Sequence, residues 1–540
     1  MPRVTIDDRT LEVAAGTNLV DAAAAAGVQI PHYCYHPRLS VVGQCRMCMV
    51  EVEGMPKLQA ACSTPVVKDG MVVRTQSPAA VEAQRAIMEF LLINHPLDCP
   101  ICDQAGECGL QDYSFKHGQA FSRFRFEEKR VYPEKERIPL GPTVMLNMNR
   151  CIQCTRCVRF TEEVSKTGEI GFFNRGSHAE IGTVEGRPLD NPLSTCVVDI
   201  CPVGALTSTR FRFAERVWYL DKKPSLCTGC DAGCNITLEH RRGSIKRYKP
   251  RYNAEVNDYW MCDFGRGTHE RYRDEPRLLS PLVRKNDELA PASWREAIDA
   301  LFQAVRAKRA DGVTAFLGSG FLTTEEAFLL AQLARLVESP HLSVWTDSGP
   351  ARQIPNPRGG VSGREAAPNR RGAEWAGLVP GADGLDGENL LLEGGADRCA
   401  ALFVADSDFG KAARDPRVVE RLRKARFLAV MGWADTPLAR AADVVLPAAT
   451  HAEREGTFVN SQSRLQRFTR AFPAPSQARP GVEILAELLG RFEPRWGSVD
   501  AATAFDLLAE EVDRFAELRW HSLPPQGVSL AAREAPEGAA

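Results

Sequence analysis

The sequence predicts a multidomain α/β protein whose N-terminal half is held together by bound metal. Its 540 residues are enough for three or four domains of about 150 residues each. Sixteen of its 17 cysteines lie between Cys34 and Cys262. Beyond about residue 276, continuous apolar strands alternate with helices, a pattern typical of a doubly wound, mostly parallel sheet.

The amino-acid composition and net charge exclude several classes of protein. Apolar residues make up 44% and charged residues 25% of the chain, as in soluble globular proteins, which excludes wholesale disorder. The net charge of −2 gives no electrostatic reason to bind nucleic acid or a membrane surface. We see neither a signal peptide nor a membrane span, and expect a cytosolic chain that meets a membrane only through partner subunits. Disulfides are rare in the cytosol, so clustered thiols indicate metal.

Residues 1–77 are predicted to form a small β-rich domain. Thr17 is expected to cap a helix from Asn18 to Ala26, which ends at Gly27. A second helix begins at Ser77-Pro78, a capping residue followed by proline. Alternating apolar residues predict four strands, which are Val4–Ile6, Leu11–Val13, Val50–Val52 and Met71–Val73.

Residues 95–275 are rich in cysteine and loops, so bound metal would have to help hold them together. The segment Asp347–Arg371 is rich in Pro, Gly and Arg and is expected to be a mobile loop. The predicted C-terminal strands are Val313–Leu317, Leu342–Trp345, Ala400–Val404, Phe427–Met431 and Val444–Leu446, with helices at Thr324–Val337 and Pro416–Ala425.

The first candidate ligand set has gaps of ten, two and 13 residues between its cysteines. Four thiolates on the loops of a small β domain suit a [2Fe-2S] cluster. A four-cysteine zinc site is the alternative, but such sites prefer two close pairs, and only one close pair is present. The set is Cys34, Cys45, Cys48 and Cys62.

The second candidate set combines one histidine with three cysteines. Three thiolates cannot complete a [4Fe-4S] cluster, and the histidine stands where a fourth ligand could fold back. Its neutral imidazole would make the cluster easier to reduce, as in Rieske centres. A zinc site with three cysteines and one histidine is the alternative. The set is His95, Cys99, Cys102 and Cys108.

The third candidate set is a Cys-x2-Cys-x2-Cys triplet with a remote Cys-Pro, the signature of bacterial ferredoxins with [4Fe-4S] clusters. Cys196 competes with Cys201 for the fourth position, and Pro202 favours Cys201. Nearby arginines either place positive charge beside the cluster or form a solvated basic turn. The set is Cys151, Cys154, Cys157 and Cys201, and the arginines are Arg150, Arg156 and Arg159.

The fourth candidate set is Cys227, Cys230, Cys234 and Cys262. It resembles the [4Fe-4S] segment that opens the catalytic chains of molybdopterin oxidoreductases. In those chains a basic residue shortly after the last cysteine links cluster and pterin, whereas here Cys262 is followed by Asp263-Phe-Gly-Arg266. Fifteen cysteines and one histidine thus make 16 ligands, and Cys196 and Cys399 are left over.

The order of the four sets resembles the large iron–sulfur subunit, of the G type, of bacterial NADH–quinone oxidoreductase, respiratory complex I. A second similarity is Ala442–Asn460, which resembles a molybdopterin-enzyme segment. The resemblance implies a β-grasp [2Fe-2S] domain (1–77), a histidine-plus-three-cysteine segment (78–118) and a ferredoxin-type domain (119–219). After these it implies a molybdopterin-oxidoreductase-type [4Fe-4S] domain (220–275), a shortened molybdopterin-oxidoreductase-like α/β domain (276–523) and a disordered tail (524–540).

The resemblance also implies an electron route with no substrate site on this chain. Electrons from NADH pass through flavin on a neighbouring subunit to the Cys34 set. They continue to the Cys151 set, to the His95 set, and then to a subunit nearer quinone. The Cys227 set lies off this route and is structural in the family. Such a chain would hold one [2Fe-2S] and three [4Fe-4S] clusters, without molybdopterin, in a complex on the cytoplasmic side of the cell membrane.

Two other oxidoreductase classes share parts of this layout. An iron hydrogenase needs further cysteines in its second half, where only Cys399 stands. A formate dehydrogenase needs a cysteine or selenocysteine to hold molybdenum, and no cysteine lies between Cys262 and Cys399. An iron–sulfur subunit of an NAD-linked hydrogenase or formate dehydrogenase stays the alternative, followed by a zinc-shaped interaction module.

Overall fold

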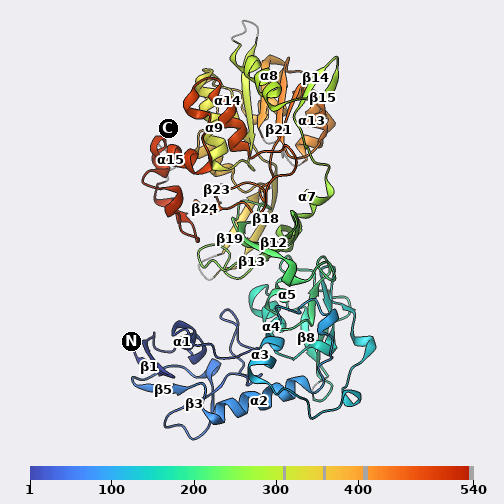
Figure 1. Ribbon diagram of the computed structural model, residues 1–540, viewed down its shortest axis with the longest axis vertical. Helices are drawn as coiled ribbons and strands as arrows, with labels where there is room; N and C mark the ends of the chain where they lie inside the picture. Colours follow the sequence, from blue (N-terminus) through green and yellow to red (C-terminus); the bar gives the residue numbers. More distant parts are fainter. Residues whose placement is uncertain (175, 308–311, 357–359, 406–410, 534–540) are drawn as a thin grey trace. The chain divides into compact units, whose positions relative to one another are not determined.

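The computed structural model describes residues 1–174, 176–307, 312–356, 360–405 and 411–533. Its internal contacts divide the chain into two units, Met1–Leu220 and Asp221–Ala540, which Figure 1 colours from blue to green and from green to red. Across the described residues, none of the helices combines the length and the apolar composition that crossing a bilayer requires.

The first unit begins with a five-stranded mixed sheet in the order β2-β1-β5-β3-β4. β1 and β5 run parallel, and the other neighbours are antiparallel. The predicted cap of α1 (Leu19–Ala25) is wrong by one residue, because the side chain of Asn18, not Thr17, accepts the Asp21 N–H. The strands are β1 (Arg3–Ile6), β2 (Arg9–Glu12), β3 (Met49–Val52), β4 (Gln59–Ala60) and β5 (Met71–Arg74).

Two helices follow this sheet. α2 (Pro78–Leu92) begins as predicted, since the Ser77 side chain accepts the Ala80 N–H and Pro78 takes the first helical position. α3 (Gly109–His117) is shorter and starts directly after Cys108. The two helices pack against each other, so the polypeptide between them turns back on itself and carries His95 and three cysteines.

The rest of the first unit consists of short elements joined by long connections. A three-stranded sheet has the order β10-β7-β6, and β8 pairs with β9. Elements this short form no large regular sheet, so bound metal at the cysteine-rich turns would add to the stability of this region. The elements are β6 (Ile138–Pro139), β7 (Val144–Leu146), α4 (Arg156–Arg159), β8 (Ile170–Phe173), β9 (Glu180–Thr183), α5 (Cys196–Ile200) and β10 (Leu206–Ser208).

The second unit opens with an antiparallel meander of β11 (Asp221–Leu226), β12 (Asn235–Arg241) and β13 (Ser244–Pro250). Two short helices, α6 (Asp263–Gly267) and α7 (Glu270–Asp274), lead into the large sheet. Cysteines 227 to 234 lie on the connection between β11 and β12, and Cys262 caps α6. Regular strands therefore hold the ends of the fourth ligand loop.

The large sheet has seven strands in the order β15-β14-β22-β21-β20-β16-β17. The five strands from β22 to β17 are parallel to one another, and β14 is antiparallel to both β22 and β15. This confirms the doubly wound, mostly parallel prediction. The strands are β14 (Leu282–Lys285), β15 (Glu288–Pro291), β16 (Val313–Ser319), β17 (Leu342–Trp345), β20 (Cys399–Ala405), β21 (Leu428–Gly432) and β22 (Val444–Pro447).

Helices cover both faces of this sheet, as its continuous apolar strands require. One core joins residues of the sheet to α8 (Trp294–Arg306), α9 (Thr324–Leu336), α14 (Gly481–Gly490) and α15 (Ala501–Glu511) (Figure 1). The opposite core joins it to α11 (Gly387–Leu391), α12 (Pro416–Leu422) and α13 (Pro437–Ala441).

Two predictions about irregular segments are wrong. Residues expected to form a mobile loop pair as a hairpin of β18 (Ser348–Ile354) and β19 (Val361–Glu365), with 357–359 outside the described residues. In the expected disordered tail, β25 (Val528–Ser529) pairs with β24 (Arg464–Phe468), which also pairs with β23 (Gly456–Val459). Both predictions were made from amino-acid composition, which does not show whether a segment pairs with another strand. Residues 534–540 of the tail lie outside the described residues.

Candidate metal centres

The structure brings the four thiols of the first set together on loops around the N-terminal sheet. Cys34 contacts both Cys45 and Cys62, and Cys62 contacts Cys48. The backbone N–H of Cys34 also points at the Cys45 sulfur, at 3.5 Å. Contact with Cys45 and Cys62 lowers the pKa of Cys34, whereas contact with Cys34 and Cys48 raises the pKa of Cys62. Four thiols this close can all be deprotonated together only if a cation lies among them.

The three cysteines of the second set lie between α2 and α3, within electrostatic range of one another. Burial, followed by the charges of Cys102 and Cys99, raises the pKa of Cys108 to about 11. A Cβ placed on Gly204 would collide with the Cys102 sulfur. The backbone thus approaches this sulfur as closely as only glycine allows.

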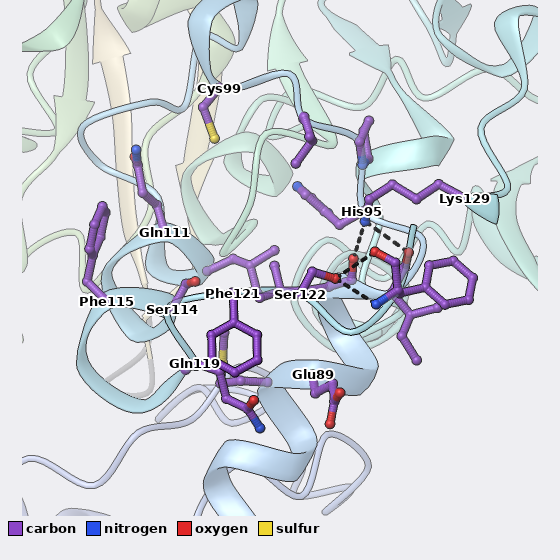
Figure 2. Close-up of a pocket in the computed structure, with 18 of the residues that line it drawn as sticks. Glu89, His95, Cys99, Gln111, Ser114, Phe115, Gln119, Phe121, Ser122 and Lys129 are labelled. Carbon is purple, nitrogen blue, oxygen red and sulfur yellow. Dashed lines mark hydrogen bonds between the residues drawn. The ribbon is translucent and has the colours of Figure 1, made fainter. Parts of the chain in front are cut away.

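His95 follows the end of α2 and lines the same cavity of about 550 Å³ as Cys99 and Cys108. Figure 2 shows this cavity with His95 and Cys99 labelled. Burial, together with the charges of Arg150 and Lys129, lowers the pKa of His95 to about 4. The imidazole is therefore neutral at pH 7, which is the form that binds metal ions.

The four thiols of the third set line one small cavity at α4. Gln153 and Thr155 have positive φ angles of 54° and 59°, and this tight turn directs the Gln153 N–H at the Cys151 sulfur, at 3.4 Å. Cys196, the competing candidate, is buried at the start of α5. The turn thus supplies a backbone amide donor to the Cys151 sulfur.

The solvated-turn interpretation of the neighbouring arginines is wrong. Arg150 and Arg159 are each only 5% exposed. Arg150 donates two hydrogen bonds to Asp98, at 3.0 and 2.8 Å, and thereby joins the third set's turn to the loop between His95 and Cys99. Buried guanidinium groups require partners, so these arginines belong to the interior around the ligand sets.

The fourth set is buried in the second unit between the meander and α6. Gly229 and Gly265 direct their N–H groups at the sulfurs of Cys227 and Cys262, both at 3.4 Å. Burial, followed by the charges of Cys230 and Cys262, raises the pKa of Cys227. A Cβ on Gly265 would lie 2.8 Å from the Cys227 sulfur, so this sulfur too is closely packed by backbone.

Sequence reasoning missed Arg352 at the fourth set. Its guanidinium lies 3.8 Å from the ring centroid of Phe264, and its charge favours the thiolate forms of Cys227, Cys230 and Cys262. Arg352 comes from β18, inside the segment predicted as a loop. No local spacing indicated it, because it is 90 positions beyond Cys262 in the numbering.

The remaining cysteine, Cys399, is a core residue. It is 1% exposed in β20, and its thiol donates to the Gly395 carbonyl at 3.7 Å. Burial raises its pKa to about 12. An uncharged thiol packed against apolar side chains acts as a small hydrophobic residue.

Across the part of the chain that the structure describes, no group of three or more His, Cys, Asp or Glu side chains is arranged to hold a single metal ion. A [4Fe-4S] cluster distributes its four protein ligands over separate irons. Buried thiols, amide donors aimed at sulfur and glycines packed against sulfur are the features of these sets that fit such clusters.

Comparison with known families assigns the same succession of domains. The family described as "2Fe-2S iron-sulfur cluster binding domain" matches residues 2–78. "NADH-ubiquinone oxidoreductase-G iron-sulfur binding region" matches 84–123, and "NADH-quinone oxidoreductase subunit 3, ferredoxin-like domain" matches 141–207. "Molybdopterin oxidoreductase Fe4S4 domain" matches 220–273, and "Molybdopterin oxidoreductase" matches 277–354 and 378–491. The fold and these matches define an iron–sulfur protein with a molybdopterin-oxidoreductase-type C-terminal domain.

Relatives with similar sequences carry the same subunit name in different organisms. The G subunit of NADH-quinone oxidoreductase from Rickettsia bellii is 42% identical over 330 residues, 61% of this chain and 47% of the relative. The corresponding G subunit from Streptomyces coelicolor is 44% identical over 336 residues, 62% of this chain and 39% of the relative. The resemblance to the G-type iron–sulfur subunit is confirmed, and the chain spans about half the length or less of these curated relatives.

A solved structure is similar to part of this chain. A chain from the crystal structure of an NAD⁺-reducing [NiFe]-hydrogenase in the H₂-reduced state is 31% identical, with a TM-score of 0.36. The match covers 40% of this chain and 91% of that chain.

Proposed function

We propose that this chain is an iron–sulfur electron-transfer subunit of an NADH–quinone oxidoreductase. In this role it relays electrons from a flavin- and NADH-binding partner subunit towards quinone, with no substrate site of its own. The observation that carries the proposal is the gathering of each predicted ligand set in the fold, in an order that also occurs in the family matches. The complex would place the chain on the cytoplasmic side of the cell membrane, with other peripheral-arm subunits as neighbours.

The proposed ligands are 15 thiolates and one imidazole. The N-terminal domain would hold one [2Fe-2S] cluster, and three [4Fe-4S] clusters would follow. When bound, these clusters supply reversible one-electron chemistry. The ligands are Cys34, Cys45, Cys48 and Cys62 for the first, His95, Cys99, Cys102 and Cys108 for the second, Cys151, Cys154, Cys157 and Cys201 for the third, and Cys227, Cys230, Cys234 and Cys262 for the fourth.

The residues of the chain would set how readily each site accepts an electron. Burial keeps water from most of the sulfurs, and N–H groups directed at sulfur favour the more negative, reduced form. Because His95 is neutral, the second site carries one negative charge fewer than a site with four thiolate ligands. Arg150, Arg159 and Arg352 add positive charge close to the ligand sets. The protein thus contributes electrostatics, positioning and the exclusion of water.

Metal content tests this proposal directly. We expect about 14 Fe per chain, from one two-iron and three four-iron clusters, in full-length protein purified without oxygen. Electron paramagnetic resonance of the reduced chain should separate the two-iron from the four-iron signals. Cys154→Ser should remove one four-iron signal, whereas Cys399→Ser, which changes a buried thiol outside the sets, should remove none.

The opposite result would be a colourless protein that contains zinc and little iron. The same analysis tests the expectation that no molybdopterin is bound, since molybdenum or a pterin in the preparation would contradict it.

We further propose that the fourth cluster lies off the electron route and is structural. Cys230→Ala should then remove one spectroscopic signal while the assembled complex still oxidises NADH at close to the wild-type rate. Loss of turnover in complexes that still assemble would instead place this cluster on the route.

A further inference from the structure

One buried guanidinium in the first unit contacts ligand residues of two different sets. Nη2 of Arg159 donates to the carbonyl of Cys34, at 2.6 Å, and to the carbonyl of Cys154, at 3.2 Å. Nη1 donates to the carbonyl of Ser40 at 2.5 Å, and Nε donates to Thr155 Oγ1 at 3.3 Å. Cys34 belongs to the first set and Cys154 to the third, so one side chain joins two sites that lie far apart in the sequence.

The surrounding contacts join the same two segments. Arg156 donates to the carbonyls of Tyr35 and Ile200, and Gln44 Nε2 donates to the Gln153 carbonyl at 2.8 Å. Ser40 donates through its N–H and hydroxyl to Glu163. The loop that follows Cys34 is therefore attached along its length to the turn and helix of the third set.

Arg159 brings a buried positive charge to this junction. Its four acceptors are neutral oxygens, while the side chain is only 5% exposed. A buried cation is costly unless an anion lies nearby. Thiolate-ligated clusters at the first and third sets would supply negative charge on both sides of this guanidinium. The planar fork of arginine also suits four diverging acceptors better than a lysine ammonium does.

We propose that Arg159 is a positioning residue that couples the first and third cluster sites. It holds the Cys34 and Cys154 backbones at a fixed separation, and its charge stabilises the reduced form of both clusters at once. The inference rests on the proposed function, because it requires a cluster in each of the two sets. It goes beyond that function by naming a residue whose single charge acts on both reduction potentials.

The test uses full-length protein loaded with its clusters and redox titration followed by electron paramagnetic resonance. Arg159→Met removes the charge and keeps much of the side-chain volume. We expect the reduction equilibrium constant to fall at both sites, by about tenfold at each, which is about 59 mV for a one-electron couple. Arg159→Lys keeps the charge but cannot reach all four oxygens, so it should give smaller shifts of the same sign at both sites.

Two variants serve as controls. Arg216 donates to the carbonyls of Cys102 and Pro100, so Arg216→Met should shift only the second site. Gln44→Leu removes a neutral hydrogen bond between the same two segments as Arg159 and should leave both potentials near their wild-type values.

The inference is overturned if Arg159→Met moves only one of the two potentials, or neither. It is also overturned if Arg216→Met moves the first and third sites equally, since the effect would then be general loosening. If the methionine variant does not fold, the lysine variant decides, and a shift confined to one site rejects the coupling. Wild-type protein without a cluster in either set would instead reject the proposed function itself.

Discussion

Gly363 lies against the sulfur of Cys230, so closely that a Cβ on this glycine would stand 2.5 Å from Sγ. The contact joins β19, in the hairpin of β18 and β19, to the loop that carries Cys227, Cys230 and Cys234. Asp231 in that loop accepts the N–H groups of Arg364 and Glu365, at 2.7 and 3.2 Å. The hairpin therefore forms part of the enclosure of the fourth set.

The first prediction concerns this contact. Gly363→Ala should displace the hairpin from Cys230, because the new methyl group would overlap the sulfur. We expect loss of the fourth cluster, measured as about four fewer Fe per chain and one missing signal. Gly497→Ala is the control, since its Cβ would meet its nearest atom at 3.5 Å, an ordinary contact. A Gly363→Ala protein with full iron content and an unchanged signal would contradict the prediction.

The second prediction concerns His95. Replacing neutral imidazole by thiolate adds one negative charge to the second site, so His95→Cys should keep a cluster that is harder to reduce. A redox titration should show a lower midpoint potential for this signal alone. His117, on α3 and outside the ligand sets, provides the control, and His117→Gln should leave the midpoint unchanged. An unchanged or raised midpoint in His95→Cys would argue against ligation by His95.

The third prediction separates the two candidates for the last ligand of the third set. Cys201 lines the cavity together with the triplet cysteines, whereas Cys196 begins α5. Cys201→Ser should therefore lose or strongly alter the third cluster's signal, and Cys196→Ser should retain it. Both variants remove one buried or half-buried thiol, so they match as a pair. The reverse pattern would make Cys196 the ligand.

The fourth prediction is a pH dependence of stability in the second unit. Burial raises the pKa of Glu325 from its usual 4.5 to about 7, although Thr457 hydrogen-bonds the carboxylate. Between these values the folded chain keeps a proton that the unfolded chain has released. The free energy of unfolding should therefore fall as the pH rises from about 4.5 to 7, by about 3 kcal/mol from this group.

Glu325→Gln removes this contribution. Urea denaturation at pH 5, 6, 7 and 8 should show the variant gaining stability relative to wild type as the pH rises. Glu483→Gln, at an exposed position of α14, should follow the wild-type curve. Parallel curves for wild type and Glu325→Gln would show that Glu325 keeps an ordinary pKa.

Much of the fold could be predicted because its signals are local. The parallel sheet follows from continuous apolar strands such as Ala400–Val404, and the start of α2 follows from Ser77-Pro78. The predicted cap of α1 was wrong by one residue, because Thr17 and Asn18 are both good capping residues. The prediction of a mobile loop at 348–365 was wrong, because strand pairing, and not Pro and Gly content, decides whether a segment is ordered.

By itself, the sequence determined the candidate ligands and their order, because cysteine spacing within a loop limits which thiols one cluster can reach. It also determined the alternation of strand and helix, through short-range hydrophobic periodicity. Only the tertiary structure decided what surrounds the ligands. Arg159 meets Cys34, and Gly363 meets Cys230, across 125 and 133 positions of sequence. Such neighbours leave no spacing pattern, because packing of the whole chain brings them together.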